Sequence, residues 1–155
     1  MIVKASVDYK MKRMFDRIDR AIDKGMDIGA KSIAETLVII SREQLAERVA
    51  ATNGKWTGNL SNAIQLVTYG TSIVGYKRYD LKVDTGIAPY AIWIDRGHNA
   101  GEFMPYAKAG GRDYSNSKFK GHRYLSDAVQ FIKKDGYATL ITANSILHEI
   151  KKFSR

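Results

Sequence analysis

The stretch Met11–Ile40, MKRMFDRIDRAIDKGMDIGAKSIAETLVII, decides the fold. Apolar residues recur in it at the spacing of one helical face, and charged residues fill the opposite face. This pattern predicts an amphipathic helix of about forty residues, with Asp8 as its N-cap and Asn53-Gly54 as its stop. The apolar face consists of Met11, Phe15, Ile18, Ile22, Met26, Gly29, Ile33, Leu37 and Ile40.

Two glycines interrupt this helical pattern. Gly25 and Gly29 predict a kink in one long helix, and a hairpin of two helices broken at Gly25 fits the same residues. A helix of forty residues is longer than a compact domain of this size requires. Helices longer than about 25 residues often pack against a second copy or lie along an assembly surface.

The middle of the chain changes to the period-2 pattern of half-buried strands. Gln65–Val74 is rich in apolar, aromatic and β-branched residues, and in Leu81–Ile87 such residues alternate with Lys82, Asp84 and Gly86. Gly75–Asp80, between them, predicts a hairpin turn. The two strands are expected to pair antiparallel, because so short a link cannot make a parallel crossover.

Helical patterns return in the second half. Pro89–Gly97 predicts one or two helical turns, with proline at the start and glycine at the end. His98–Gly121 is rich in Gly, Asn and Ser and predicts a long mobile loop. Tyr124–Phe153 predicts a second helical region that Gly136 bends or splits. The expected fold is therefore α+β: one domain over 1–155, with a long N-terminal helix, a small antiparallel sheet, a short middle helix, a long flexible loop at 98–121 and a C-terminal helix.

Composition narrows the function classes. The chain has 155 residues, no cysteine and a formal net charge of +9 at pH 7. Without cysteine there can be no disulfide, thiolate metal site or cysteine nucleophile. The positive charge favours phosphate-bearing polymers or other anionic partners. The first residues do not resemble a secretion leader, and no apolar run approaches the roughly 18 residues of a membrane span, so we expect synthesis in the cytoplasm and no membrane partner.

Signatures of catalysis are weak. Gly70–Gly75 has the glycine spacing of a phosphate-binding loop, but Tyr76 stands where the lysine belongs. Only His98 and Glu102 have a spacing that suits a metal on a helix, in a segment without a helical pattern. We therefore expect no enzyme activity, no catalytic or metal site and no cofactor. The alternative is a hydrolytic site assembled in space from the carboxylates Asp80, Asp84, Asp95, Glu102 and Asp113.

The predicted loop mixes aromatic and basic residues. Such a mixture can stack on bases and neutralise phosphates, so a nucleic-acid-binding module that uses residues 98–124 is the alternative function. The same aromatics can instead dock the loop onto its own chain or a neighbouring subunit, which we favour. The residues concerned are Phe103, Tyr106, Lys108, Arg112, Tyr114, Lys118, Phe119, Lys120, Arg123 and Tyr124.

Three short segments, in this order, resemble the tail-completion or head-to-tail joining (neck) proteins of long-tailed double-stranded DNA phages. Thr57-Gly58-Asn59-Leu60 with Ile64 is similar to the family's Ser/Thr-Gly-x-Leu and following Ile. Tyr90–His98 is similar to its Tyr-Ala, aliphatic, Glu, Gly-Thr run, although Asp95, Arg96 and His98 depart from that pattern. His122–Ala128 is similar to the aromatic-Leu-x-x-Ala segment that opens the family's last helix.

The resemblance implies a viral structural protein of the virion, assembled in the host cytoplasm and located at the head-tail junction. It implies a homo-oligomeric ring, commonly a hexamer, between the portal or head connector and the tail-tube terminator, with the viral DNA passing through its lumen. For its oligomer and partner interfaces we expect aromatic and charged residues of the second and third segments and of the loop, together with Trp56 before the first segment. These are Trp56, Tyr90, Trp93, Asp95, Arg96, His98, Phe103, Tyr106, Arg112, Tyr114, Phe119 and Tyr124.

Overall fold

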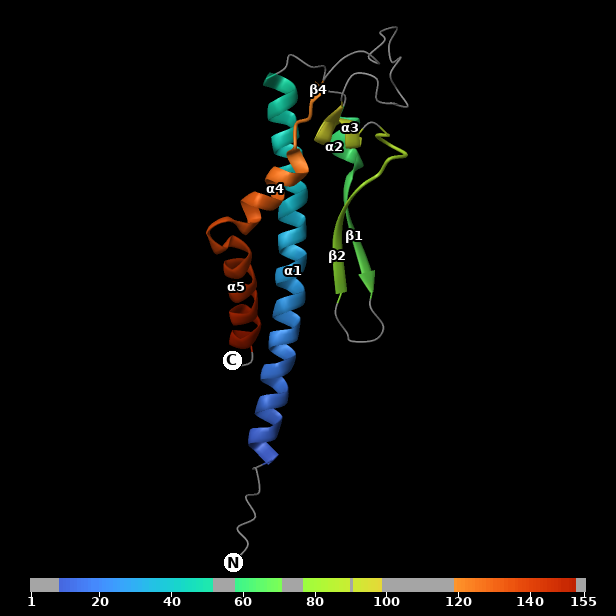
Figure 1. Ribbon diagram of the computed structural model, residues 1–155. Helices are drawn as coiled ribbons and strands as arrows, with labels where there is room; N and C mark the ends of the chain where they lie inside the picture. The colour runs from blue at the N-terminus through green and yellow to red at the C-terminus, as the bar shows by residue number, and fades with distance from the viewer. Residues whose placement is uncertain (1–8, 52–57, 71–76, 90, 99–118, 153–155) are drawn as a thin grey trace, which may run out of the picture. The chain divides into compact units, whose positions relative to one another are not determined.

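The computed structural model describes residues 9–51, 58–70, 77–89, 91–98 and 119–152. They form an α+β fold (Figure 1). The predicted fold class is confirmed, and helices predominate. The chain divides into two compact units, which are described separately: unit 1 contains Met1–Ile33 and Gly136–Arg155, and unit 2 contains Ala34–Asp135.

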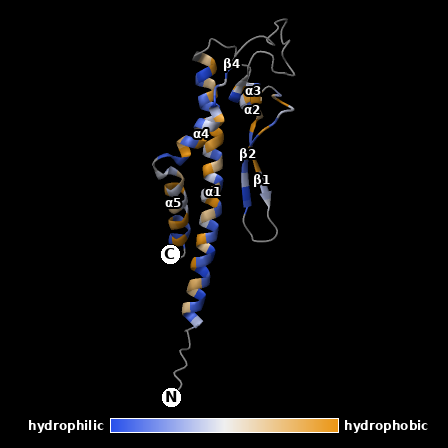
Figure 2. Ribbon diagram, viewed as in Figure 1, coloured by the Kyte–Doolittle hydropathy of each residue, from blue (hydrophilic) through white to orange (hydrophobic). Residues whose placement is uncertain are grey.

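Helix α1, Tyr9–Ala51, is one continuous helix of 43 residues. The prediction of a long helix is confirmed, and the alternative of a hairpin broken at Gly25 is wrong. Hydrophobic and hydrophilic residues alternate along its ribbon in Figure 2, as expected for an amphipathic helix. The predicted cap Asp8 and stop Asn53-Gly54 lie outside the described residues.

Unit 1 consists of the first part of α1 and helix α5, Tyr137–Lys152. The two glycines of α1 are buried where α5 packs. A Cβ atom added at Gly25 would lie 2.5 Å from the Cα of Ile146, and one at Gly29 would lie 2.9 Å from the Cα of Thr142. The pairing of 25 with 146 and 29 with 142 makes the helices antiparallel, and the missing side chains let the backbones approach closely.

A buried carboxylate lies in the same helix pair. The Glu149 side chain is 2% exposed, and its Oε2 is 3.0 Å from the Nζ of Lys24 on α1. Lys152, one turn further along α5, donates a hydrogen bond to Oε1. Both lysine bonds favour the charged carboxylate and hold the pKa of Glu149 below its ordinary value.

Unit 2 contains the main hydrophobic core. Helix α2, Asn59–Ala63, follows Gly58, whose φ of 75° is in the left-handed region that glycine tolerates. The core gathers side chains from the second part of α1, from α2 and from segments further along the chain, and consists of Val38, Leu45, Leu60, Ala63, Ile64, Ala88, Ala91 and Tyr124.

A two-stranded antiparallel hairpin extends from α2 (Figure 1). Strand β1, Ile64–Gly70, pairs with β2, Lys77–Val83, from Ile64 opposite Val83 to Gly70 opposite Lys77. Antiparallel pairing is confirmed. The predicted turn at 75–80 is too long, because Lys77–Asp80 belong to β2, and Thr85–Ile87 form a turn in which the N–H of Gly86 donates to Asp84 Oδ1.

Helix α3, Ala91–Arg96, confirms the predicted middle helix, and Gly97 after it has a φ of 85°. The predicted loop is wrong at both ends: strand β3, Gly97–His98, pairs antiparallel with β4, Phe119–Lys120. Residues 99–118 lie outside the described part. Helix α4, Tyr124–Lys133, the 3-10 turn η2, Lys134–Gly136, and α5 confirm that Gly136, with a φ of 69°, splits the last helical region.

Candidate functional site

Two segments distant in sequence, Ile94–Gly97 and Gly121–Leu125, lie side by side, and we call this pair of segments the junction. The backbone N–H groups of His122 and Arg123 donate to the carbonyls of Ile94 and Asp95, both at 2.8 Å. The end of α3 and the start of α4 are therefore joined by main-chain hydrogen bonds across nearly thirty residues of sequence.

Asp95 fixes the direction of α4. Its Oδ1 accepts the N–H of Leu125 at 3.0 Å, in the first turn of α4. The first N–H groups of a helix lack partners within the helix, so this carboxylate acts as a cap from outside. Arg123, immediately before α4, has a left-handed φ of 53° and provides no side-chain cap itself.

Position 121 of the junction leaves no room for a side chain, so glycine is required there. A Cβ atom there would lie 2.2 Å from the carbonyl oxygen of Asp95 and 2.2 Å from the nitrogen of Gly97. Both are backbone atoms, which cannot move aside as a flexible side chain would. Any larger residue at 121 would force β3 and β4 apart.

All three segments that carry the phage resemblance meet in unit 2. Leu60 and Ile64 of the first segment share the buried core with Ala91 of the second and Tyr124 of the third. The second and third segments are also joined by the junction. The three segments therefore lie together in one part of the fold, although they are spread over some seventy residues of sequence.

Charged groups surround the start of α4. Arg48 of α1 forms an ion pair with Asp127, although the two residues are 79 apart in sequence. Partial burial lowers the pKa of His122, and the positive charge of Arg48 adds to this effect. Burial raises the pKa of Tyr124 well above its ordinary value, with a further contribution from the Asp95 carboxylate. Tyr124 therefore stays a neutral phenol.

The outer surface of α3 is apolar and cationic. The guanidinium of Arg96 lies 4.4 Å from the centre of the Trp93 ring, a cation–π contact. Ile92 is 55% exposed. Next to it is a pocket of about 230 Å³, lined by Val83, Ala91, Ile92, Asp95, Arg96 and Leu125. Its size suits a single apolar side chain of a partner better than a small-molecule ligand.

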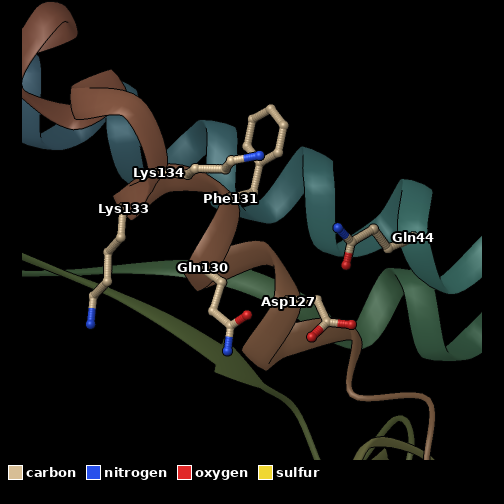
Figure 3. Close-up of a pocket in the computed structure, with 6 residues that line it drawn as sticks. All are labelled: Gln44, Asp127, Gln130, Phe131, Lys133 and Lys134. Carbon is tan, nitrogen blue, oxygen red and sulfur yellow. The ribbon is translucent and has the colours of Figure 1, made fainter.

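A second, more open pocket of about 530 Å³ lies between α1 and α4 (Figure 3). It is lined by Gln44, Asp127, Gln130, Phe131, Lys133 and Lys134. Figure 3 shows the side chains of Gln130 and Lys133 pointing away from Gln44, and Asp127 is already paired with Arg48. A ligand site needs polar groups that converge on one point, and these diverge.

The predicted interface residues have different locations. Arg96 is exposed, Trp93 and Asp95 are half-buried, and Tyr124 is fully buried in the core, where a partner cannot reach it. For His98 and Phe119 the structure describes the backbone, in β3 and β4, and not the side chains. The positions outside the described residues are Trp56, Tyr90, Phe103, Tyr106, Arg112 and Tyr114.

Sequence reasoning missed Ile92, Arg48 and Asp127. Ile92 stands among apolar neighbours in a short helix, so its exposure had no signal in the sequence. The Arg48–Asp127 pair joins residues too far apart for any spacing rule. Among the described residues, no three His, Cys, Asp or Glu side chains are grouped to hold a metal ion. No helix in the described ranges is long and apolar enough to cross a membrane.

Comparison with known proteins gives no relative: no family model matches the chain, and no curated protein or solved structure matches it.

Proposed function

We propose that this protein is a virion structural component of the head-to-tail interface of a tailed phage, where it forms an oligomeric ring between the portal or head connector and the tail tube. The observation that carries the proposal is the convergence of the three resembling segments. A chance likeness of three short motifs does not require them to meet, whereas shared architecture does. Here Ile64, Ala91 and Tyr124 belong to one buried core.

The surface of α3 supports an assembly role. Ile92, Trp93 and Arg96 combine an exposed aliphatic side chain, a half-buried indole and a guanidinium stacked on it. Aromatic residues and arginine are enriched in protein interfaces, where they dominate the binding energy. The small apolar pocket beside Ile92 provides a place for an anchoring side chain from the next subunit.

The test is the mass of the purified protein across a concentration series, measured by light scattering, with electron microscopy of any large species. Closed rings are expected, alone or on addition of the portal protein. Ile92→Asp should abolish them, because it places an unpaired charge in the interface. Val129→Asp is the matched control: Val129 is also exposed, at 41%, but lies on α4.

Two results would contradict the proposal. One is a chain that forms no ring with or without portal protein. The other is a monomer that binds short DNA tightly with a steep salt dependence, which would indicate a nucleic-acid-binding module instead.

A further inference from the structure

The two strands of the hairpin differ in charge. Strand β1, IQLVTYG, contains no charged residue, whereas β2, KRYDLKV, contains Lys77, Arg78, Asp80 and Lys82. Charged residues, lysine above all, prevent a sheet edge from pairing with another chain. The edge of β2 is protected in this way, and the edge of β1 is not.

The hydrogen-bond pattern identifies which backbone groups β1 presents at its outer edge. Asp84 N–H donates to the carbonyl of Ala63 at 2.8 Å, in register with the ladder. Bonded and non-bonded pairs alternate in an antiparallel ladder. Gln65, Val67 and Tyr69 therefore bond to β2, and Leu66 and Thr68 direct their N–H and C=O groups outward.

At one end of this outer edge, the outward backbone carbonyl already accepts a hydrogen bond. Arg42 of α1 donates from Nη2 to the outward carbonyl of Ile64 at 2.7 Å. Within the described residues, the outward groups of Leu66 and Thr68 have no hydrogen-bond partner. Thr68, Tyr69 and Gly70 are exposed, and a Cβ atom at Gly70 would meet nothing within 4 Å. An incoming strand can therefore reach the edge.

We propose that β1 pairs antiparallel with β1 of a second copy of this chain, about a two-fold axis at Val67. In this register Leu66 lies opposite Thr68 of the second copy, and each such pair exchanges two hydrogen bonds. Val67 lies opposite Val67 of the second copy, and Gln65 lies opposite Tyr69. Only uncharged side chains meet across the new contact.

The charge distribution favours this partner over β2 of a second copy. Pairing β2 with β2 would bring Arg78 and the lysines of two chains together. Pairing β1 with β2 would leave one unprotected β1 edge on every open assembly. The two-fold pair produces a four-stranded sheet whose outer edges are both the charged β2. It also extends a two-stranded hairpin, which alone is marginally stable in water.

The inference goes beyond the proposed function and does not rest on it, since a two-fold pair can be the free form of a chain whose ring uses other surfaces. The absence of cysteine permits a direct test. In Val67→Cys, the two thiols of a pair would sit at a non-bonded position with Cα atoms about 4.5 Å apart, within the range for a disulfide. In Thr68→Cys, they would be about 8 to 9 Å apart, beyond that range.

With oxidised glutathione as oxidant, Val67→Cys should form covalent dimers at least about fivefold faster than Thr68→Cys. Equal rates at the two positions, or no dimer at either, would overturn the proposal. If β1 instead paired with β2 of a second chain, the two thiols of Val67→Cys would not meet, and one of these two results would be observed.

Sedimentation of chains without an introduced cysteine gives a second measurement. Thr68→Pro removes an outward N–H and leaves the β1–β2 ladder intact, so it should weaken association at least about tenfold. Thr68→Ala keeps the N–H and should associate as the original chain does. An original chain that stays monomeric at every concentration would refute the pairing. A Thr68→Pro chain that forms the two-chain species as strongly as the original would show that β1 is not the contact. Thr68→Pro should still form rings with portal protein, because the ring uses other surfaces, and failure of the original chain to form rings would refute only the proposed function.

Discussion

The two units maintain their structure by different means. Unit 1 is a helix pair in which close backbone approach at Gly25 and Gly29 substitutes for a broad core, and its exposed side chains include Met14, Phe15 and Leu140. Unit 2 buries a cluster of larger side chains, including Leu45, Ile64 and Tyr124. The helix pair of unit 1 should therefore be sensitive to added atoms, and the hydrophobic core of unit 2 to removed ones.

The largest effect is expected in unit 2. Leu45 is 0% exposed, so Leu45→Ala removes buried apolar contacts and leaves a cavity. The free energy of unfolding should fall by about 2–5 kcal/mol in a urea titration. Leu147→Ala, at a position 52% exposed in unit 1, is the control and should change it by less than about 0.5 kcal/mol. Equal losses for the two variants would refute the contrast.

The next largest effect comes from adding atoms to unit 1 instead of removing them from unit 2. Gly→Ala within a helix normally stabilises it by about 0.5–1 kcal/mol. At Gly25 the new methyl group would lie 2.5 Å from the Cα of Ile146, so Gly25→Ala should instead destabilise unit 1, by roughly 1–3 kcal/mol.

Hydrogen exchange provides the measurement for this variant. Exchange should accelerate in α5 and remain unchanged around Tyr124 in unit 2. Asn144→Ala, on the exposed side of α5, is the matched control and should leave exchange in α5 as it was. Stabilisation by Gly25→Ala would show that the helices do not need their close approach.

A third, smaller effect concerns the junction. Asp95→Ala removes the acceptor of the Leu125 N–H and should cost about 1 kcal/mol, the usual value of a helix cap. Asp95→Asn keeps an acceptor oxygen and should recover most of the loss. Thermal unfolding of both variants checks this, and equal losses would show that the charge matters more than the cap.

The smallest expected effect is a dependence of the stability of unit 1 on pH, through Glu149. Because the pKa of Glu149 is lowered in the folded chain, its contribution to stability is present above the ordinary glutamate pKa and is lost as pH falls through the lower folded value. The protection of α5 amides, that is, the slowing of their exchange relative to an unfolded chain at the same pH, should therefore fall below about pH 4.5. Glu149→Gln should flatten this dependence, whereas the exposed Glu43→Gln should not.

The sequence predicts the elements better than their contacts. Periodicity identified the long helix, the paired strands, the short middle helix and the split at Gly136, because each has a local pattern. It assigned Gly25 to a kink, since one helix alone does not reveal that Ile146 will lie against it. The four-residue spacing of Ala21, Gly25 and Gly29 was the available signal for close helix packing.

The candidate site was predictable only in part. The second and third motif segments contain the residues of the junction, but the role of Asp95 as a cap for Leu125 depends on residues thirty apart. The same holds for β3 with β4, whose two-residue strands are too short for any periodic signal. Exposure could not be predicted either: Tyr124 was expected at an interface and is buried.

The packing of unit 1 has a consequence for synthesis on the ribosome. The first part of α1 is translated well before its partner α5, because about 120 residues separate Gly25 from Ile146. At about 5–20 residues per second, the delay between Gly25 and Ile146 is on the order of ten seconds. During that time the face of α1 around Ala21, Gly25 and Gly29 has no native partner, so a chaperone that binds apolar helices could protect it.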